Sequence, residues 1–167
     1  FLSNNLAAGV ATIVACEGSR SLVVDLQSLV SVTSYATPRR TATGVGTNRL
    51  HQILAVLEKH FGFTLSRYDC YLAVAGGLDV EEPAADLGIA AAIVSSYRGL
   101  IISKGTVLIG EIGLGGQLRP VGQLTQRLQE AFRLKFKRAI VPAKCGINNS
   151  LNEMNIEVLE ASNVNEA

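Results

Sequence analysis

Apolar and polar residues alternate along the chain with two different periods, and each period predicts a type of element. Residues 9–16 and 21–31 are rich in β-branched and other apolar residues and are separated by a short polar turn, which predicts a β-hairpin. Residues 48–60 carry apolar side chains at helical spacing, which is typical of an amphipathic helix. We expect Asn48 to cap this helix and Gly62 to end it.

The rest of the chain continues this alternation of extended and helical patterns. The expected elements are a strand over 68–75, a helix over 84–97, a hairpin of 106–112 with 117–121, a helix over 124–135, strands over 138–142 and 156–159, and a truncated helix start over 163–167. The Ala and Gly content of the helix at 84–97 predicts close packing against a sheet. Alternating strands and helices, with hairpins early and late, predict a single α+β (or two-layer α/β) domain over 1–167 with a mixed sheet.

The helix expected at 124–135 has an apolar side and a charged side. We expect the apolar side to face the core; it consists of Leu124, Leu128, Ala131 and Phe132. We expect the charged side to face solvent; it consists of Arg127, Glu130 and Arg133.

The composition fits a well-buried globular domain, since apolar residues make up 48% of the chain and charged residues 17%. The net charge of +1 provides no strongly basic field, so nucleic-acid binding would require local clusters of basic residues. No apolar run approaches the roughly 20 residues that span a bilayer, and the first residues do not resemble a signal peptide. Because the sequence lacks an initiator Met, we expect a fragment of a longer protein.

The cysteines and histidines do not have the spacing of a metal site. Cys16, Cys70 and Cys145 are odd in number, and we interpret them as buried free thiols in a reducing compartment. His51 and His60 flank one expected helix and are interpreted as helix-flank residues rather than ligands. We therefore expect no metal site in this chain.

The stretch with the most specific pattern is a strand-to-helix turn at residues 76–88. Gly76 and Gly77 permit a tight turn, and Pro83 suits the first turn of a helix. Folds often place a nucleophile or an anion site at such a turn, yet Ala84 offers no reactive group. The nearby carboxylates could hold a metal or could be helix-start and surface charges, and we favour the second interpretation for Asp79, Glu81, Glu82 and Asp86.

The basic residues gather in two regions, with one more on the first hairpin turn. The candidate DNA-binding residues are Arg39, Arg40 and Arg49, then Arg127, Arg133, Lys137 and Arg138, and finally Arg20 on the hairpin turn. Arginine beside small hydroxyl residues, as at 37–44, is suited to phosphate contacts. The alternative is an ordinary solvated face, which is favoured for Arg127 and Arg133 because both lie within helical reach of Glu130.

Three segments resemble one known family and occur in the family's order. They are Ser34–Gly44, then Val74–Gly77 with Glu82–Leu87, and then Ile109–Gly116 through to Arg138–Pro142. Together they resemble the C-terminal Lon-protease-like domain of the RadA (Sms) family of bacterial DNA repair proteins. The resemblance implies the fold of the Lon proteolytic domain, which is shared with GHMP kinases and one ribosomal protein domain.

The same resemblance implies that the chain lacks the catalytic pair of an active Lon protease. Ala84 stands at the position of the serine and Thr125 at the position of the lysine. A serine–lysine dyad needs a hydroxyl that attacks and an amine that accepts its proton, and neither is present. Ser95, Ser96 and Cys70 are too distant or too buried to be expected as substitutes. We therefore expect no catalytic residue, and an active peptidase remains the remote alternative.

The resemblance also implies partners and cofactors. DNA, both single-stranded and branched, a homo-oligomeric hexameric ring and the recombinase RecA are the implied partners, without a membrane. ATP, Mg²⁺ and Zn²⁺ are implied only for the full-length protein, because the sequence contains neither the zinc-finger nor the ATPase motif. The implied location is the bacterial cytoplasm, with an organelle such as the chloroplast as an alternative. The alternative function is a purely structural oligomerisation module.

Overall fold

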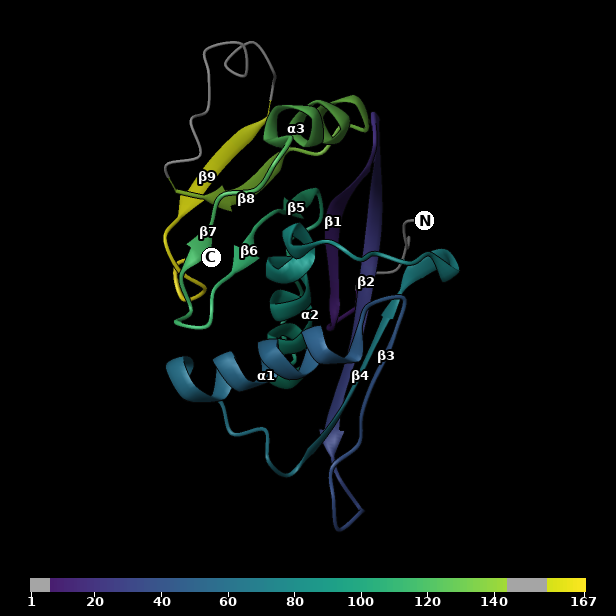
Figure 1. The fold of residues 1–167 in the computed structure, drawn as a ribbon, viewed down its shortest axis with the longest axis vertical. Coiled ribbons are helices and arrows are strands. Elements are labelled where there is room, and N and C mark those ends of the chain that lie inside the picture. Colours follow the sequence, from purple (N-terminus) through teal and green to yellow (C-terminus); the bar gives the residue numbers. More distant parts are fainter. Residues whose placement is uncertain (1–6, 144–155) are drawn as a thin grey trace.

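The computed structural model describes residues 7–143 and 156–167 of the 167-residue chain. Its largest sheet has four strands in the order β1 (Val10–Glu17), β2 (Arg20–Val32), β4 (Tyr68–Val74) and β3 (Arg40–Thr43). The first three strands pair antiparallel, and β3 runs parallel to β4. The expected hairpin, the strand near residue 70 and the mixed sheet are confirmed (Figure 1).

Two smaller sheets complete the strand set of the described residues. One is a parallel sheet of three strands: β5 (Thr106–Leu108), β8 (Arg138–Pro142) and β9 (Glu157–Ala161). In this sheet β8 lies in the middle. The strands β6 (Glu111–Ile112) and β7 (Leu118–Arg119) form a short antiparallel pair.

Of the hairpin expected at 106–112 and 117–121, only the part next to the turn forms, as the pair β6 and β7. The chain changes sheets at Gly110, whose backbone N–H donates to Ala84 O and whose backbone oxygen accepts from the N–H of Leu87. These two bonds tie Gly110 to the start of a helix instead of to a partner strand. As a result β5 pairs with β8, and only β6 pairs with β7.

In the described residues, three α-helices cover the sheets: α1 (Thr47–Phe61), α2 (Asp86–Arg98) and α3 (Leu124–Arg133). Figure 1 shows α1 and α2 on one face of the four-stranded sheet and α3 beside β8 and β9. Gly62 ends α1 with φ 73°, as expected. Asn48 is not the cap, because the helix begins one residue earlier, after Gly46, and no side chain caps it.

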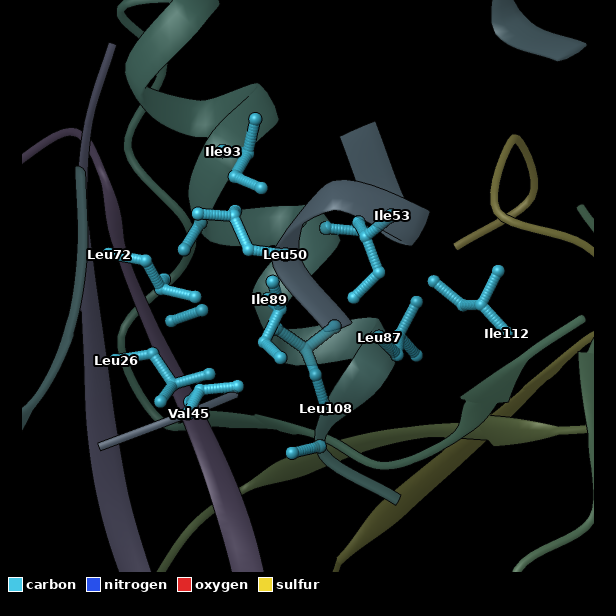
Figure 2. Close-up of a cluster of buried hydrophobic side chains, with 14 of the residues drawn as sticks. Leu26, Val45, Leu50, Ile53, Leu72, Leu87, Ile89, Ile93, Leu108 and Ile112 are labelled. Carbon is cyan, nitrogen blue, oxygen red and sulfur yellow. The ribbon is translucent and has the colours of Figure 1, made fainter. Parts of the chain in front are cut away.

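The larger core lies between the four-stranded sheet and the helices α1 and α2. Figure 2 shows Leu26 and Leu72 from the sheet facing Leu50 of α1 and Ile89 of α2. The helix α2 approaches the sheet closely because Gly88 has no side chain: a Cβ there would lie 2.1 Å from Cγ2 of Ile13. The close packing expected of this helix is confirmed.

A second core lies under α3. Val14 and Val23 of the hairpin pack there with Leu128 of α3 and Ala139 of β8. Successive residues of a strand point to opposite faces, so Ile13 faces the larger core while Val14 faces the second. The strands β1 and β2 are therefore shared by both cores.

Two expectations about side chains are wrong. Arg127 is buried, with 4% of its surface exposed, and Phe132 is exposed, the reverse of the expected arrangement on α3. Residues 163–167 form a turn in which the backbone oxygen of Asn163 accepts from the N–H groups of Glu166 and Ala167, and Asn163 also bridges to Gln117. The turn is held by Asn163, whose side-chain oxygen accepts from the N–H of Glu166.

The free thiols differ in their surroundings. Cys70 is buried in the larger core, whereas Cys16 is half-buried at the end of β1. Both are free, and Cys145 lies outside the described residues. Burial raises the pKa of the Cys70 thiol, against smaller lowering effects of a hydrogen bond with Ser28 and of the charge of Arg40.

Candidate functional site

The strand-to-helix turn has the architecture expected from its sequence. After β4 the chain makes a 3₁₀ turn at Ala75–Gly77, in which Gly76 and Gly77 have φ values of 74° and 67°. These positive values require glycine or strain. A second 3₁₀ turn at Pro83–Ala85, with Pro83 at its first position, then leads into α2. The segment between the turns is anchored by Val80, whose N–H donates to Gly44 O at 2.6 Å.

Ala84 sits at the position where a nucleophile would be expected, but it contributes only backbone chemistry. Its methyl side chain is buried, and its carbonyl accepts the N–H of Gly110 at 3.0 Å. Thr125 is half-buried in the first turn of α3. Neither a hydroxyl at the turn nor an amine on α3 is available at these two positions.

An ion pair between the buried Arg127 and the half-buried Glu82 links the turn to α3. The Arg127 guanidinium contacts the Glu82 carboxylate, with Nη1–Oε1 at 2.5 Å and Nη2–Oε2 at 3.3 Å. The same guanidinium donates from Nη1 to Val14 O at 2.8 Å and from Nε to Gly122 O at 3.0 Å. The N–H of Cys16 donates to Glu82 Oε1 at 3.2 Å. Arg127 therefore cross-links β1, α3 and the turn, and its charge is not presented to solvent.

A second ion pair lies behind the turn, at the start of α2. The Asp86 carboxylate is fully buried; it accepts the N–H of Ile112 at 3.1 Å and contacts Arg49 Nε at 3.3 Å. Burial raises the pKa of Asp86 to about 6, and the hydrogen bond and the Arg49 charge oppose this increase, whereas Glu111 adds to it. Oδ1 accepts no hydrogen bond within the described residues and has the Arg49 ion pair alone. This carboxylate joins α1, α2 and β6.

The hydroxyls considered as substitute nucleophiles are occupied by the backbone. Ser95 Oγ accepts the N–H of Gly9 at 2.8 Å and donates to Leu100 O. Ser96 Oγ accepts the N–H of Val30 at 2.9 Å. Both side chains fasten the far end of α2 to neighbouring segments, away from Ala84 at the helix start.

Arg39 and Arg40 are adjacent in sequence but have different contacts. The Arg40 side chain points toward α1: it donates from Nη2 to Leu65 O at 2.9 Å and lies 3.7 Å from the Glu58 carboxylate. Arg39 is exposed, and its backbone N–H is fixed by Asp69 Oδ1 at 2.7 Å. Within the described residues the Arg39 guanidinium forms no ion pair and instead lies over the ring of Tyr35, 4.0 Å from its centroid.

The remaining candidate basic residues do not converge on one patch. Arg133 pairs with Glu130 on α3, and Arg138 pairs with Glu157 across β8 and β9. Arg20 and Lys137 are exposed and form no ion pair with another described residue. Arg20 begins β2, whereas Arg39 lies near the other end of that strand, which has 13 residues, so the two are separated by roughly 35 Å at about 3.3 Å per residue.

Tyr35 is a residue that the sequence analysis did not select. It lies in the loop between β2 and β3, at the lower tip of the molecule in Figure 1, with 47% of its surface exposed. The available signal was an aromatic residue four positions before Arg39 in an otherwise polar loop. Aromatic residues interleaved with basic ones are a feature of single-strand binding surfaces.

Among the described residues, the helices are too short or too polar for a membrane, and the potential metal ligands are dispersed. None of the helices in residues 7–143 and 156–167 is long and apolar enough to cross a membrane. In the same part of the chain, no three His, Cys, Asp or Glu side chains are grouped so that they could hold a metal ion.

The chain matches the model of a known protein family. Residues 40–145 match a family model described as subunit ChlI of Mg-chelatase. The matched segment is more than half of the chain and contains β3, α1, the strand-to-helix turn, α2 and α3.

The chain is also similar to individual DNA repair proteins. The chain is 62% identical over 134 residues to DNA repair protein RadA of Synechocystis sp., which covers 80% of the chain and 26% of that protein. It is 46% identical to the RadA protein of Halalkalibacterium halodurans and 43% identical to that of Bacillus subtilis, in both cases over 96% of the chain and 35% of the relative. The chain belongs to the ChlI family by this match, and its similarity to these relatives assigns it to the RadA family of DNA repair proteins. It spans about a third or less of the length of these relatives.

Proposed function

We propose that the chain is a Lon-protease-like domain that lacks peptidase activity and binds DNA within a RadA-type repair protein. The name of the relatives, DNA repair protein RadA, supports the repair role. The observation that carries the DNA-binding proposal is Arg39, an exposed guanidinium held on a fixed backbone and without an ion pair among the described residues. A charge of this kind is available for a phosphate oxygen.

The lack of peptidase activity is supported by the surroundings of the turn. The side chain of Ala84 is a methyl group, and the nearest cation from α3, Arg127, is committed to Glu82 and two backbone carbonyls. An arginine with these partners does not act as a proton acceptor, because its guanidinium stays charged at any physiological pH. The turn therefore has neither the nucleophile nor the base of a serine–lysine dyad.

The test of DNA binding compares Arg39→Ala with Arg40→Ala in the full-length protein. Affinity for duplex and single-stranded DNA is measured across a salt series. Loss of one phosphate contact should weaken binding to all sequences and reduce the slope of log K against log salt by about 1. Arg40→Ala is the matched control: it should lower stability, because Arg40 ties β3 to α1, and leave the salt slope unchanged. An unchanged affinity and slope for Arg39→Ala would refute the proposal.

Assembly into a ring is a second candidate function, and an apolar surface favours it. Leu100 and Ile101, in the segment after α2, are 62% and 56% exposed. They border a groove of about 240 Å³ whose lining is mainly apolar and includes Val94, Ile102 and Ile140. Exposed neighbouring apolar residues of this kind are typical of protein interfaces.

The assembly hypothesis is tested by mass measurement of the full-length protein. Light scattering or native mass spectrometry of Leu100→Ser with Ile101→Ser should show a smaller species than the wild-type protein. Leu114→Ser, at the exposed tip between β6 and β7, is the control and should leave the mass unchanged. An unchanged mass for the double variant would exclude this surface from the interface.

We propose the remaining partners and cofactors for the full-length protein only. It would assemble as a hexameric ring, have RecA as a partner and use ATP, Mg²⁺ and Zn²⁺. Its location would be the cytoplasm of a bacterium or an organelle.

A further inference from the structure

Tyr35 and Arg39 form a stacked pair at one end of the four-stranded sheet. The Arg39 guanidinium lies 4.0 Å from the centroid of the Tyr35 ring, which still exposes 47% of its surface. The loop is fixed at both ends: Thr33 N–H donates to Arg67 O at 2.9 Å, and Asp69 holds the backbone of Arg39. The pair is therefore presented by an anchored loop.

The outer face of the sheet continues from this pair. Because side chains alternate along a strand and Arg40 contacts Glu58 of α1, Thr41 and Thr43 of β3 share the face opposite to α1; Arg39 directly precedes this strand. Thr41 lies beside Tyr71 of β4, which in turn lies beside Leu29 of β2. Figure 1 shows both α1 and α2 on the other face of this sheet.

A groove of about 490 Å³ runs over this outer face. Its described lining comes from the start of β1, the middle of β2, and β3 and β4, and includes Gln27, Thr41, Thr43 and Tyr71. No lining residue in the described part of the chain is acidic. Asp69, which is buried, accepts the backbone N–H of Arg39 in the adjoining loop. In the described part of the chain, the groove and this loop together offer the Arg39 cation, hydroxyl and amide groups and two tyrosines, and the groove lining contains no carboxylate.

We infer that this outer face binds single-stranded DNA, with a base stacked on Tyr35 and the adjoining phosphate held by Arg39. The inference rests on the proposed DNA binding and adds the surface that holds the single strand and the residue that distinguishes it from a duplex. The ring of Tyr35 can stack only on an unpaired base, since duplex bases are stacked on one another. Arg39 contacts phosphates of either form, so Tyr35 is the residue that distinguishes them.

The experiment measures the affinity of the full-length protein for two probes by fluorescence anisotropy. The probes are an oligothymidylate of about 15 nucleotides, which is within the site size of one single-strand binding module, and a duplex of the same length. Tyr35→Ala should weaken binding of the oligothymidylate by about 5- to 100-fold and leave duplex binding unchanged. Tyr35→Phe keeps the ring and should bind like the wild-type protein.

A matched control exists on another part of the molecule. Arg98 lies over the ring of Phe63, 4.8 Å from its centroid, and Arg98→Ala removes a stacked arginine without touching the outer face of the sheet. This variant should bind both probes like the wild-type protein. Equal loss of affinity in Arg98→Ala and Tyr35→Ala would mean that the effect is not local, and would overturn the inference.

A direct contact is tested by photocrosslinking. An oligothymidylate with 5-iodouracil bases, irradiated with the full-length protein and analysed by peptide mass spectrometry, should crosslink at Tyr35. Absence of that crosslink, or unchanged affinity of Tyr35→Ala for the oligothymidylate, overturns the inference. If Arg39→Ala weakens both probes while Tyr35→Ala weakens neither, the proposed DNA binding stands and the selection of single strands falls. If neither variant changes binding, both fall.

Discussion

Replacement of Arg127 by Met tests whether this arginine serves the fold or a ligand. Met fills a similar volume but removes the charge and all the hydrogen bonds of the guanidinium. The carbonyls of Val14 and Gly122 would lose this donor, and the Glu82 carboxylate would lose the guanidinium while keeping the N–H of Cys16. Removing one partner of a buried ion pair costs about 3–5 kcal/mol, and we expect the lower end of this range because Glu82 is 20% exposed and keeps a hydrogen bond. This is a large part of the roughly 5–15 kcal/mol that stabilises an ordinary domain.

The assay is urea unfolding of the 167-residue chain followed by far-UV circular dichroism, since the chain contains no Trp. Arg133→Met on the same helix is the control: that arginine is exposed and pairs with Glu130 three residues away. Its unfolding midpoint should stay close to that of the wild-type chain, since surface pairs contribute little. Equal midpoints for Arg127→Met and Arg133→Met would refute the structural role. Loss of DNA affinity without loss of stability in Arg127→Met would show instead that Arg127 contacts the ligand.

Three further perturbations probe the region around the turn. Burial raises the pKa of Asp86 from 3.8 to about 6, so the folded state binds this proton more tightly than the unfolded state, and the associated stability is lost as pH rises from about 4 to about 6. Urea titrations at about pH 4 and about pH 8 give the free energy of unfolding of Asp86→Asn relative to the wild-type chain. This relative free energy should increase by up to about 3 kcal/mol from the lower to the higher pH; the same value at both pH values would contradict the prediction. Gly88→Ala should destabilise the chain by about 1–3 kcal/mol, because its Cβ has no space, whereas Gly122→Ala, in open surroundings, should leave the unfolding midpoint unchanged; equal midpoints would count against the packing argument. Ala84→Ser with Thr125→Lys should not cleave an unfolded protein substrate in a gel assay, because a dyad also needs an oriented hydrogen bond between its members; detectable cleavage would show a site closer to activity than we infer.

The main elements of the fold could be predicted because their patterns are local. The β-branched runs of the first hairpin and the helical spacing of Leu50, Ile53, Leu54 and Leu57 follow directly from the sequence. The pairing of β5 with β8, instead of with the second strand of the expected hairpin, could not be predicted. It depends on the hydrogen bonds between Gly110 and the start of α2, which join segments that are distant in sequence.

The candidate site was predicted less well, and Arg127 shows why. It follows Leu124 by three residues and precedes Ala131 by four, so helical spacing alone places it on the buried face of α3. Its charge argued for solvent, and the carboxylate that compensates it, Glu82, is 45 positions away in sequence. Arg39 and Arg40 show the same limit: Arg40 contacts Glu58 and Leu65, which are distant in sequence, whereas the Arg39 guanidinium lies over Tyr35.

The sharing of β1 and β2 by two cores has a consequence for the dynamics of the chain. Ile13 and Val14 hold adjacent positions but belong to different cores, so detachment of either layer of helices exposes one side of the same hairpin. Neither layer of helices can unfold as an independent foldon, because its loss would expose apolar side chains of the strands on which the other layer also packs. We therefore expect amide protons in the centre of this hairpin to exchange with solvent through global unfolding, and the two layers of the domain to unfold as one cooperative unit.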